Sequence, residues 1–147
     1  SKAFCLAGAR VGYAIARPET LRRLARLRVG YEVPVTSQAA ALGALRSRSY
    51  VERVVREIAE TRERTRARLA QLGFHVPESR TNFIFFELPA PCRVVRAALR
   101  RLGFLVMCFD HVRELRSLAR HVRVTVGTPA EMEAFAEALS RAVGRRG

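Results

Sequence analysis

The sequence lacks the features that mark several classes of protein. No apolar run approaches the length of a membrane span, and no basic segment followed by an apolar one opens the chain as a signal peptide would. The histidines show no metal-ligand spacing. The three cysteines, Cys5, Cys92 and Cys108, lie far apart, without the paired spacing of a zinc site or a disulfide framework. We therefore expect no bound metal, reduced thiols and a cytoplasmic location.

Lysine is almost absent. Lys2 is the only lysine among 27 basic side chains, and arginine supplies the others. A lysine amine can lose its proton and condense with an aldehyde, whereas a guanidinium stays charged and binds carboxylate or phosphate through parallel hydrogen bonds. Arg10 follows Lys2 at a spacing of eight residues. On composition alone Lys2 is an ordinary surface charge, but such a pair is also what pyridoxal phosphate chemistry requires.

Acidic residues are scarce as well, and the 13 that are present leave a net charge of +14. Basic domains bind nucleic-acid phosphates, but these arginines do not form one block. Glu52 and Arg56, and Glu60 and Arg64, have the four-residue spacing of helical ion pairs. No aromatic residues are interleaved to stack bases. These patterns argue against a nucleic-acid role and leave a missing acidic segment or an acidic partner surface as explanations of the charge.

The first half of the chain begins with short segments. At 147 residues and 49% hydrophobic, the chain is large enough for one core of ordinary domain size. Residues 11–16 form an apolar run typical of a buried strand. Pro18 suits the first position of a helix over 20–27, and residues 30–35 predict a connecting loop.

A long helical region is expected next. Thr36 or Ser37 is expected to cap its start, and the alanine-rich segment behind them has high helix propensity. Beyond a predicted kink at residues 47–49, apolar residues recur at helical spacing until Gly73 ends the helix. This pattern predicts an amphipathic helix that packs one side against a core.

The second half alternates between strand and helix patterns. Expected elements are strands over 82–88, 104–109 and 122–126, a helix over 91–102 and a polar connection over 110–120. Valines alternate with Arg123 and Thr125 in the last strand, so Arg123 is expected on the face opposite the core. Residues 128–131, with the sequence Thr-Pro-Ala-Glu, predict a capping box for a closing helix. The order of elements predicts a small α/β domain.

Two segments resemble those of a known family. Residues 1–13 have the sequence Ser-Lys-Ala-Phe-Cys-Leu-Ala-Gly-Ala-Arg-Val-Gly-Tyr. They resemble the Schiff-base lysine segment of fold-type I pyridoxal-phosphate aminotransferases, most of all in the histidinol-phosphate aminotransferase branch. Residues 122–128, with the sequence Val-Arg-Val-Thr-Val-Gly-Thr, resemble the strand whose arginine binds the substrate carboxylate. The two segments occur in the family's order.

The resemblance implies roles for four residues. Lys2 would be the catalytic lysine, forming a Schiff base with pyridoxal 5'-phosphate and then moving the proton between substrate and cofactor. Arg10, helped by the Ser1 hydroxyl, would bind the cofactor phosphate. Arg123 would bind the α-carboxylate of the amino acid and so orient the bond that is cleaved.

The architecture implied by the resemblance is the α/β fold of the type I enzymes. Residues 1–34 would be the C-terminal end of the large cofactor-binding domain, 35–72 a long connecting helical region, and 73–147 the complete small C-terminal domain. An upstream part is expected in the full enzyme, so these 147 residues alone are expected to lack transaminase activity. The full enzyme would be a homodimer that acts on small-molecule amino acids and 2-oxo acids.

Some residues depart from the family pattern. Cys5 stands where the family commonly has glycine. Met107 stands where the histidinol-phosphate branch typically has an arginine for the substrate phosphate. Arg113, Arg116 or Arg120 could supply that charge from the following segment, whereas Met107 itself suits an aromatic or other apolar amino acid better.

The predicted function is transfer of an amino group between an amino acid or amino-alcohol phosphate, histidinol-phosphate-like, and a 2-oxo acid. Three alternatives stay open. One is an aromatic aminotransferase, and another is a pyridoxal-phosphate decarboxylase of a phosphorylated amino acid. The third is a truncated, inactive domain that binds a partner through its basic surface.

Overall fold

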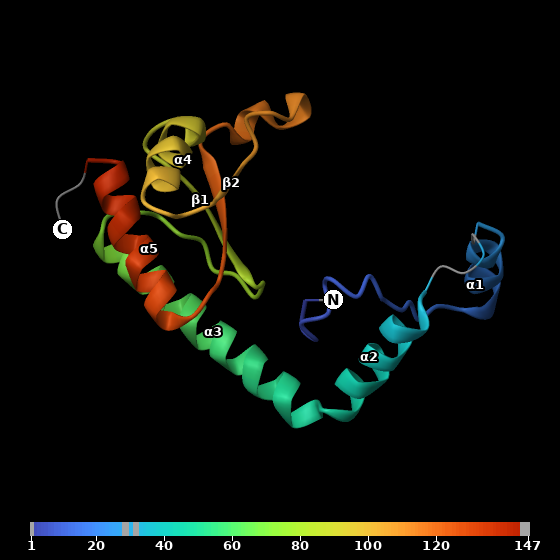
Figure 1. The fold of residues 1–147 in the computed structure, drawn as a ribbon. Coiled ribbons are helices and arrows are strands. Elements are labelled where there is room, and N and C mark those ends of the chain that lie inside the picture. Colours follow the sequence, from blue (N-terminus) through green and yellow to red (C-terminus); the bar gives the residue numbers. More distant parts are fainter. Residues whose placement is uncertain (1, 28–29, 31–32, 145–147) are drawn as a thin grey trace. The chain divides into compact units, whose positions relative to one another are not determined.

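The computed structural model describes residues 2–27, 30 and 33–144 of the chain. The chain divides into two compact units, Ser1–Val55 and Arg56–Gly147. Each is described separately below (Figure 1). Among the helices in the described ranges, none combines the length and apolar character needed to cross a bilayer.

The first unit contains α1, Pro18–Ala25, α2, Val35–Arg46, and the beginning of α3, Arg48–Gln71. Pro18 occupies the start of α1, as the sequence predicts. The strand expected over residues 11–16 is not formed, and residues 12–16 are exposed, so that prediction was wrong. A strand requires the backbone of a neighbouring strand, and the described part of this unit offers none.

The cap predicted for α2 was also wrong. Pro34 is the N-cap, with an extended backbone at φ −58° and ψ 149°, and no side chain caps the helix. Thr36 and Ser37 instead lie in the first turn. The predicted break near residue 47 is confirmed, because Ser47 has a non-helical backbone between the end of α2 and the beginning of α3.

The C-terminus of α3 forms as the sequence predicts. Gly73 adopts a left-handed backbone with φ 80°, and the Phe74 N–H donates to the Leu69 carbonyl at 2.9 Å. A positive φ of this kind favours glycine and allows the chain to turn back while the last carbonyls of the helix are satisfied. Leu69 is fully buried, so the turn also fixes the end of α3 against the core.

The second unit contains a three-stranded antiparallel sheet. Its strands are β1, Phe83–Glu87, β2, Met107–Cys108, and β3, His121–Thr125, and β3 lies in the centre. β1 falls within its predicted strand and β3 is shifted by one residue from the predicted 122–126, whereas β2 is much shorter than the expected 104–109. The Phe104 N–H donates to the Leu99 carbonyl at 2.9 Å, at the end of the preceding helix. Because this N–H is used at the helix end, residue 104 does not pair with β3 and the strand begins later.

Besides the remainder of α3, this unit contains two α-helices in its described residues. They are α4, Cys92–Arg101, and α5, Pro129–Ala142, and both lie beside the sheet (Figure 1). Their buried side chains join those of one sheet face, where Ile84, Phe86, Val122 and Val124 lie. The polar connection before β3 contains a short 3-10 helix, Arg113–Leu118. The predicted alternation of β3 is confirmed, which leaves Arg123 on the other face of the sheet.

The predicted capping box of α5 is present. The Glu131 N–H donates to the Thr128 hydroxyl at 3.3 Å, and the Thr128 N–H donates to the Glu131 carboxylate at 2.7 Å. This backbone hydrogen bond, with that of the Thr128 hydroxyl, holds the pKa of Glu131 below its ordinary value. A Cβ at Gly127 would lie 2.5 Å from the same carboxylate, so a side chain at that position would disturb the cap.

One prediction about the cysteines was wrong. Cys92 and Cys108 form a disulfide bond, with their Cα atoms 5.8 Å apart and both side chains buried. The spacing of 16 residues is no recognisable motif, but the fold brings the start of α4 against β2. Cys5 is a free, exposed thiol.

The disulfide predicts a simple thiol count. Unfolded without a reductant, the chain should expose only the Cys5 thiol to a thiol-specific reagent, because the other two sulfurs are bonded to each other. After reduction it should expose all three. The measurement requires purification in the presence of a thiol-blocking reagent, followed by mass spectrometry of the peptides that contain Cys92 and Cys108. Three reactive thiols in the unreduced chain would contradict the assignment.

Candidate functional site

The N-terminal motif adopts an irregular, tightly turned backbone. The Cys5 N–H donates to the Lys2 carbonyl at 3.1 Å, and Cys5 and Arg10 have positive φ angles of 53° and 50°. Such angles cost a residue other than glycine roughly 1–3 kcal/mol, and they concentrate at functional sites. The motif therefore has a specific shape that ordinary surface loops do not need. Ser1, the fourth predicted site residue, lies outside the described residues.

Lys2 and Arg10 are both exposed. Arg10 donates one hydrogen bond from Nη1 to the Ala7 carbonyl at 3.2 Å, which restrains the guanidinium and leaves its other donors available. Within the described part of the chain, no carboxylate pairs with either cation. The motif thus presents one amine and one guanidinium that are free to meet an anionic ligand.

Apolar residues of the same motif face α2. Phe4, Leu6 and Tyr13 line a small cavity of about 240 Å³, together with Val11, Gly12, Ala41 and Leu45. Ala41 and Leu45 belong to α2, so the motif is supported by apolar neighbours within the first unit. Lys2 and Arg10 are not among the lining residues of this cavity.

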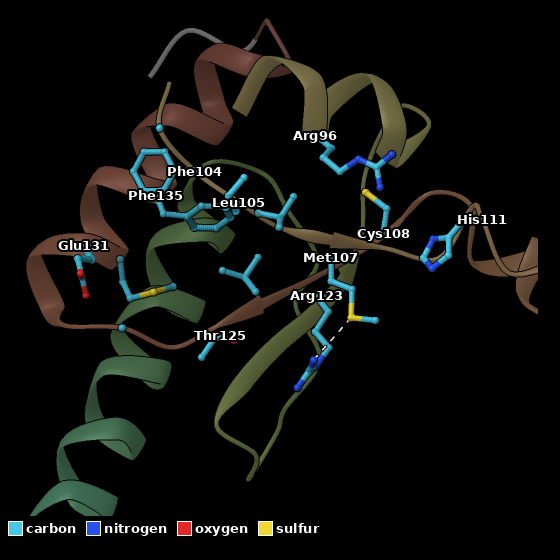
Figure 2. A pocket seen from close by; sticks show the side chains of 15 residues that line it. Arg96, Phe104, Leu105, Met107, Cys108, His111, Arg123, Thr125, Glu131 and Phe135 are labelled. Atoms are coloured by element: carbon cyan, nitrogen blue, oxygen red, sulfur yellow. Dashed lines mark hydrogen bonds between the residues drawn. The ribbon is translucent and has the colours of Figure 1, made fainter. Parts of the chain in front are cut away.

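The second unit has a larger cleft, of about 740 Å³, along β2 and the beginning of α5. Figure 2 shows Arg123 and Met107 near one end of it, with Phe104, Phe135 and Glu131 toward the other. Ten of the fifteen lining residues are apolar or glycine. Arg96 and Arg123 are the cations among the lining residues.

Arg123 is held by apolar groups. Its guanidinium carbon lies 4.1 Å from the centre of the Phe83 ring, and its Nη1 lies 3.7 Å from the sulfur of Met107. Met107 is also its cross-strand partner in the sheet. No carboxylate among the described residues pairs with Arg123, although the side chain is partly buried. A partly desolvated guanidinium without a counter-charge is well suited to bind an anion.

An aromatic surface continues from Arg123 along the same face of the sheet. Phe85, its cross-strand neighbour on β1, stacks on His121 with 5.1 Å between the ring centres. The Phe109 ring meets Phe85 edge-on at 5.6 Å. The guanidinium therefore lies beside a surface that favours flat or apolar groups over charged ones.

The arginines expected to replace the charge missing at Met107 do not line the cleft. Arg113 and Arg116 belong to the 3-10 helix, and Arg120 is engaged by the Glu87 carboxylate at 3.2 Å. Arg96 lines the cleft instead and lies 3.8 Å from Asp110. Sequence reasoning missed it, because only the packing of α4 on β2 brings this helical arginine to the cleft.

Comparisons with known proteins agree with the resemblance. The profile of the family Aminotransferase class I and II matches residues 1–139. A histidinol-phosphate aminotransferase from Chromohalobacter salexigens is 36% identical over 143 residues, which are 95% of this chain and 40% of that protein. An aromatic amino acid aminotransferase from Rhodococcus jostii is 34% identical over 135 residues, 92% of this chain and 36% of that protein.

A solved structure agrees as well. The histidinol-phosphate aminotransferase from Sinorhizobium meliloti, crystallised in complex with pyridoxal-5'-phosphate, matches with a TM-score of 0.81 and 30% identity. The match covers 98% of this chain and 39% of that one. The chain thus spans about two fifths of the length of the relatives that it matches, and the predicted α/β architecture of the fold-type I enzymes is confirmed. This chain belongs to the class I and II aminotransferase family.

Proposed function

We propose that this chain is part of a pyridoxal-phosphate-dependent aminotransferase that moves an amino group between an amino acid, or a histidinol-phosphate-like amino-alcohol phosphate, and a 2-oxo acid. The observation that carries the proposal is Arg123, a guanidinium without a counter-charge at the edge of a cleft. The amine and guanidinium of the N-terminal motif supply the remaining groups that this chemistry needs.

The side chains of the motif fit the cofactor. Pyridoxal phosphate carries an aldehyde, a phosphate and a conjugated ring, and when bound it supplies the ring that withdraws electrons from the substrate Cα. Lys2 is an exposed amine that can attach to the aldehyde, and its nitrogen would then take up and return the proton at Cα. The Arg10 guanidinium would bind the phosphate, with the Ser1 hydroxyl as a second donor.

Arg123 would bind the carboxylate of the amino acid or the 2-oxo acid. Phe83 and Met107 restrict its guanidinium before any substrate arrives, so little conformational entropy is lost when the carboxylate binds. A fixed guanidinium also orients the neighbouring Cα–H bond for proton removal.

The identity of the amino donor is a second question. Histidinol phosphate would need a cation for its phosphate. Met107 cannot supply one, and Arg96, the other arginine of the cleft, is paired with Asp110 at 3.8 Å. The cleft beside Arg123 is lined by Phe104, Leu105 and Val106, which favours an aromatic or other apolar donor. We therefore expect kcat/KM for phenylalanine to exceed that for histidinol phosphate in the enzyme that carries this chain. The opposite order, measured in one coupled assay, would favour the phosphorylated donor.

The role of Lys2 predicts where the cofactor attaches. After incubation with pyridoxal phosphate and reduction with borohydride, the enzyme that carries this chain should bear the cofactor mass on the peptide containing Lys2. Lys2→Arg should abolish this attachment and lower transaminase activity by about 10²–10⁴-fold or more, because a guanidinium neither reacts with the aldehyde nor moves the proton.

A matched control is Arg64→Lys, which places a second lysine on the exposed side of α3, and the cofactor should remain on Lys2 in that variant. Attachment that persists in Lys2→Arg would refute the assignment. The 147-residue chain by itself is expected to show no steady-state turnover.

The role of Arg123 predicts that its substitution weakens binding of the 2-oxo acid. Arg123→Lys keeps the charge but loses the paired hydrogen bonds, so KM for the 2-oxo acid should rise roughly 10- to 100-fold, the equivalent of one charged hydrogen bond. The same change at exposed Arg113 serves as the control and should leave KM unchanged. An unaltered KM in Arg123→Lys, measured by steady-state kinetics, would mean that the carboxylate is bound elsewhere.

A further inference from the structure

One face of α4 carries a row of arginines. Arg93, Arg96, Arg100 and Arg101 occur at spacings of three, four and one, which place them along one side of the helix, away from the buried Val95 and Leu99. The helix itself contains no acidic residue. Of the four, only Arg96 has an ion-pair partner among the described residues, Asp110 at 3.8 Å.

The arginine-rich composition of the chain does not explain this row. On α3, five arginines each lie within ion-pair distance of a glutamate; the pairs are Arg48 and Glu52, Arg62 and Glu63, Arg64 and Glu60, Arg66 and Glu63, and Arg68 and Glu133. The same chain therefore balances much of the positive charge on one helix and leaves it unbalanced on another.

Helix electrostatics do not explain the row either. Arg100 and Arg101 lie in the last turn of α4, where a cation interacts favourably with the helix dipole. Arg93 lies in the first turn, where the dipole disfavours a cation and where no acidic residue is present. Its position costs the helix some stability, and the helix alone gives no reason for it.

A groove runs beside these arginines. It has a volume of about 810 Å³ and is lined by the four arginines with Ala97, Leu105 and Val106. Leu105, two residues before the beginning of β2, is 83% exposed. Figure 2 shows Arg96 on α4 and Leu105 on the segment that leads into β2. The groove thus combines a positively charged rim with an exposed apolar side chain.

We propose that this groove, the α4 groove, binds an acidic segment of a partner protein that also carries an apolar side chain. Carboxylates of the segment would meet the arginines, and its apolar side chain would cover Leu105. A nucleic acid fits less well, because no aromatic residue lines the groove to stack a base and an exposed leucine gains nothing from phosphates. The α4 groove shares Arg96, Leu105 and Val106 with the lining of the cleft, but the proposal does not depend on the aminotransferase activity.

The test uses the enzyme that carries this chain and a fluorescein-labelled peptide of glutamates with two leucines, measured by fluorescence anisotropy at about 0.1 M salt. The triple variant Arg93→Gln, Arg100→Gln and Arg101→Gln should weaken binding roughly tenfold or more, because it removes the unpaired cations. The matched control changes Arg64, Arg66 and Arg141 to glutamine. It removes the same charge from ion-paired positions on α3 and α5 and should weaken binding less than about threefold.

Leu105→Asn separates the apolar contact from the charges. It should weaken binding of the leucine-containing peptide severalfold and leave an all-glutamate peptide unaffected. Leu105 is exposed, so this variant should fold even if the triple variant does not, and circular dichroism checks both.

Equal losses in the triple variant and its control would overturn the proposal, since bulk charge would then explain binding. So would an absence of peptide binding, or oligothymidylate binding that is tighter than peptide binding and insensitive to Leu105→Asn.

Discussion

The two-residue period of β3 is the constraint on which the second unit depends. Its valines point into the core that α4 and α5 complete, and the same alternation forces Arg123 onto the opposite face. A guanidinium on the valine side would be buried without a partner, which would cost several kcal/mol. A register slip of one residue would therefore remove the core and the candidate carboxylate site together. Folding and function are linked through this one strand.

The short edge strand β2 shares this constraint. Cys108 pairs with Val122 in the sheet and is bonded to Cys92 at the start of α4, which fixes it on the core side. Met107, its neighbour, must then point to the open face, where its sulfur meets Arg123. A strand of two residues has few hydrogen bonds with which to define its register, so the covalent link to α4 is well placed to supply the missing restraint. The disulfide thus helps to position Met107 and Arg123, although it does not itself contact a ligand.

Features that depend on local sequence were predictable. The capping box of α5, the end of α3 at Gly73 and the face of Arg123 each follow from a few neighbouring residues, and all three are confirmed. Features that need a distant partner were not. The apolar run at 11–16 predicts a strand only if another strand lies beside it, and the pairing of Cys92 with Cys108 depends on how α4 meets β2. The roles of Lys2, Ser1, Arg10 and Arg123 remain predictions from the family resemblance.

The positive side chains behind the net charge of +14 have different surroundings in different parts of the fold. Much of the positive charge on α3 is offset by glutamates at helical spacing, which is the pattern that argued against a nucleic-acid surface. No block of arginines occurs along the sequence. The row on α4 forms only when the helix is folded and Leu105 is brought beside it. Arg123 differs again, because it is partly buried against Phe83 and faces a cleft. The arginines of this chain therefore have different roles. The residues around each arginine indicate which anion it can bind, and the total number of arginines does not.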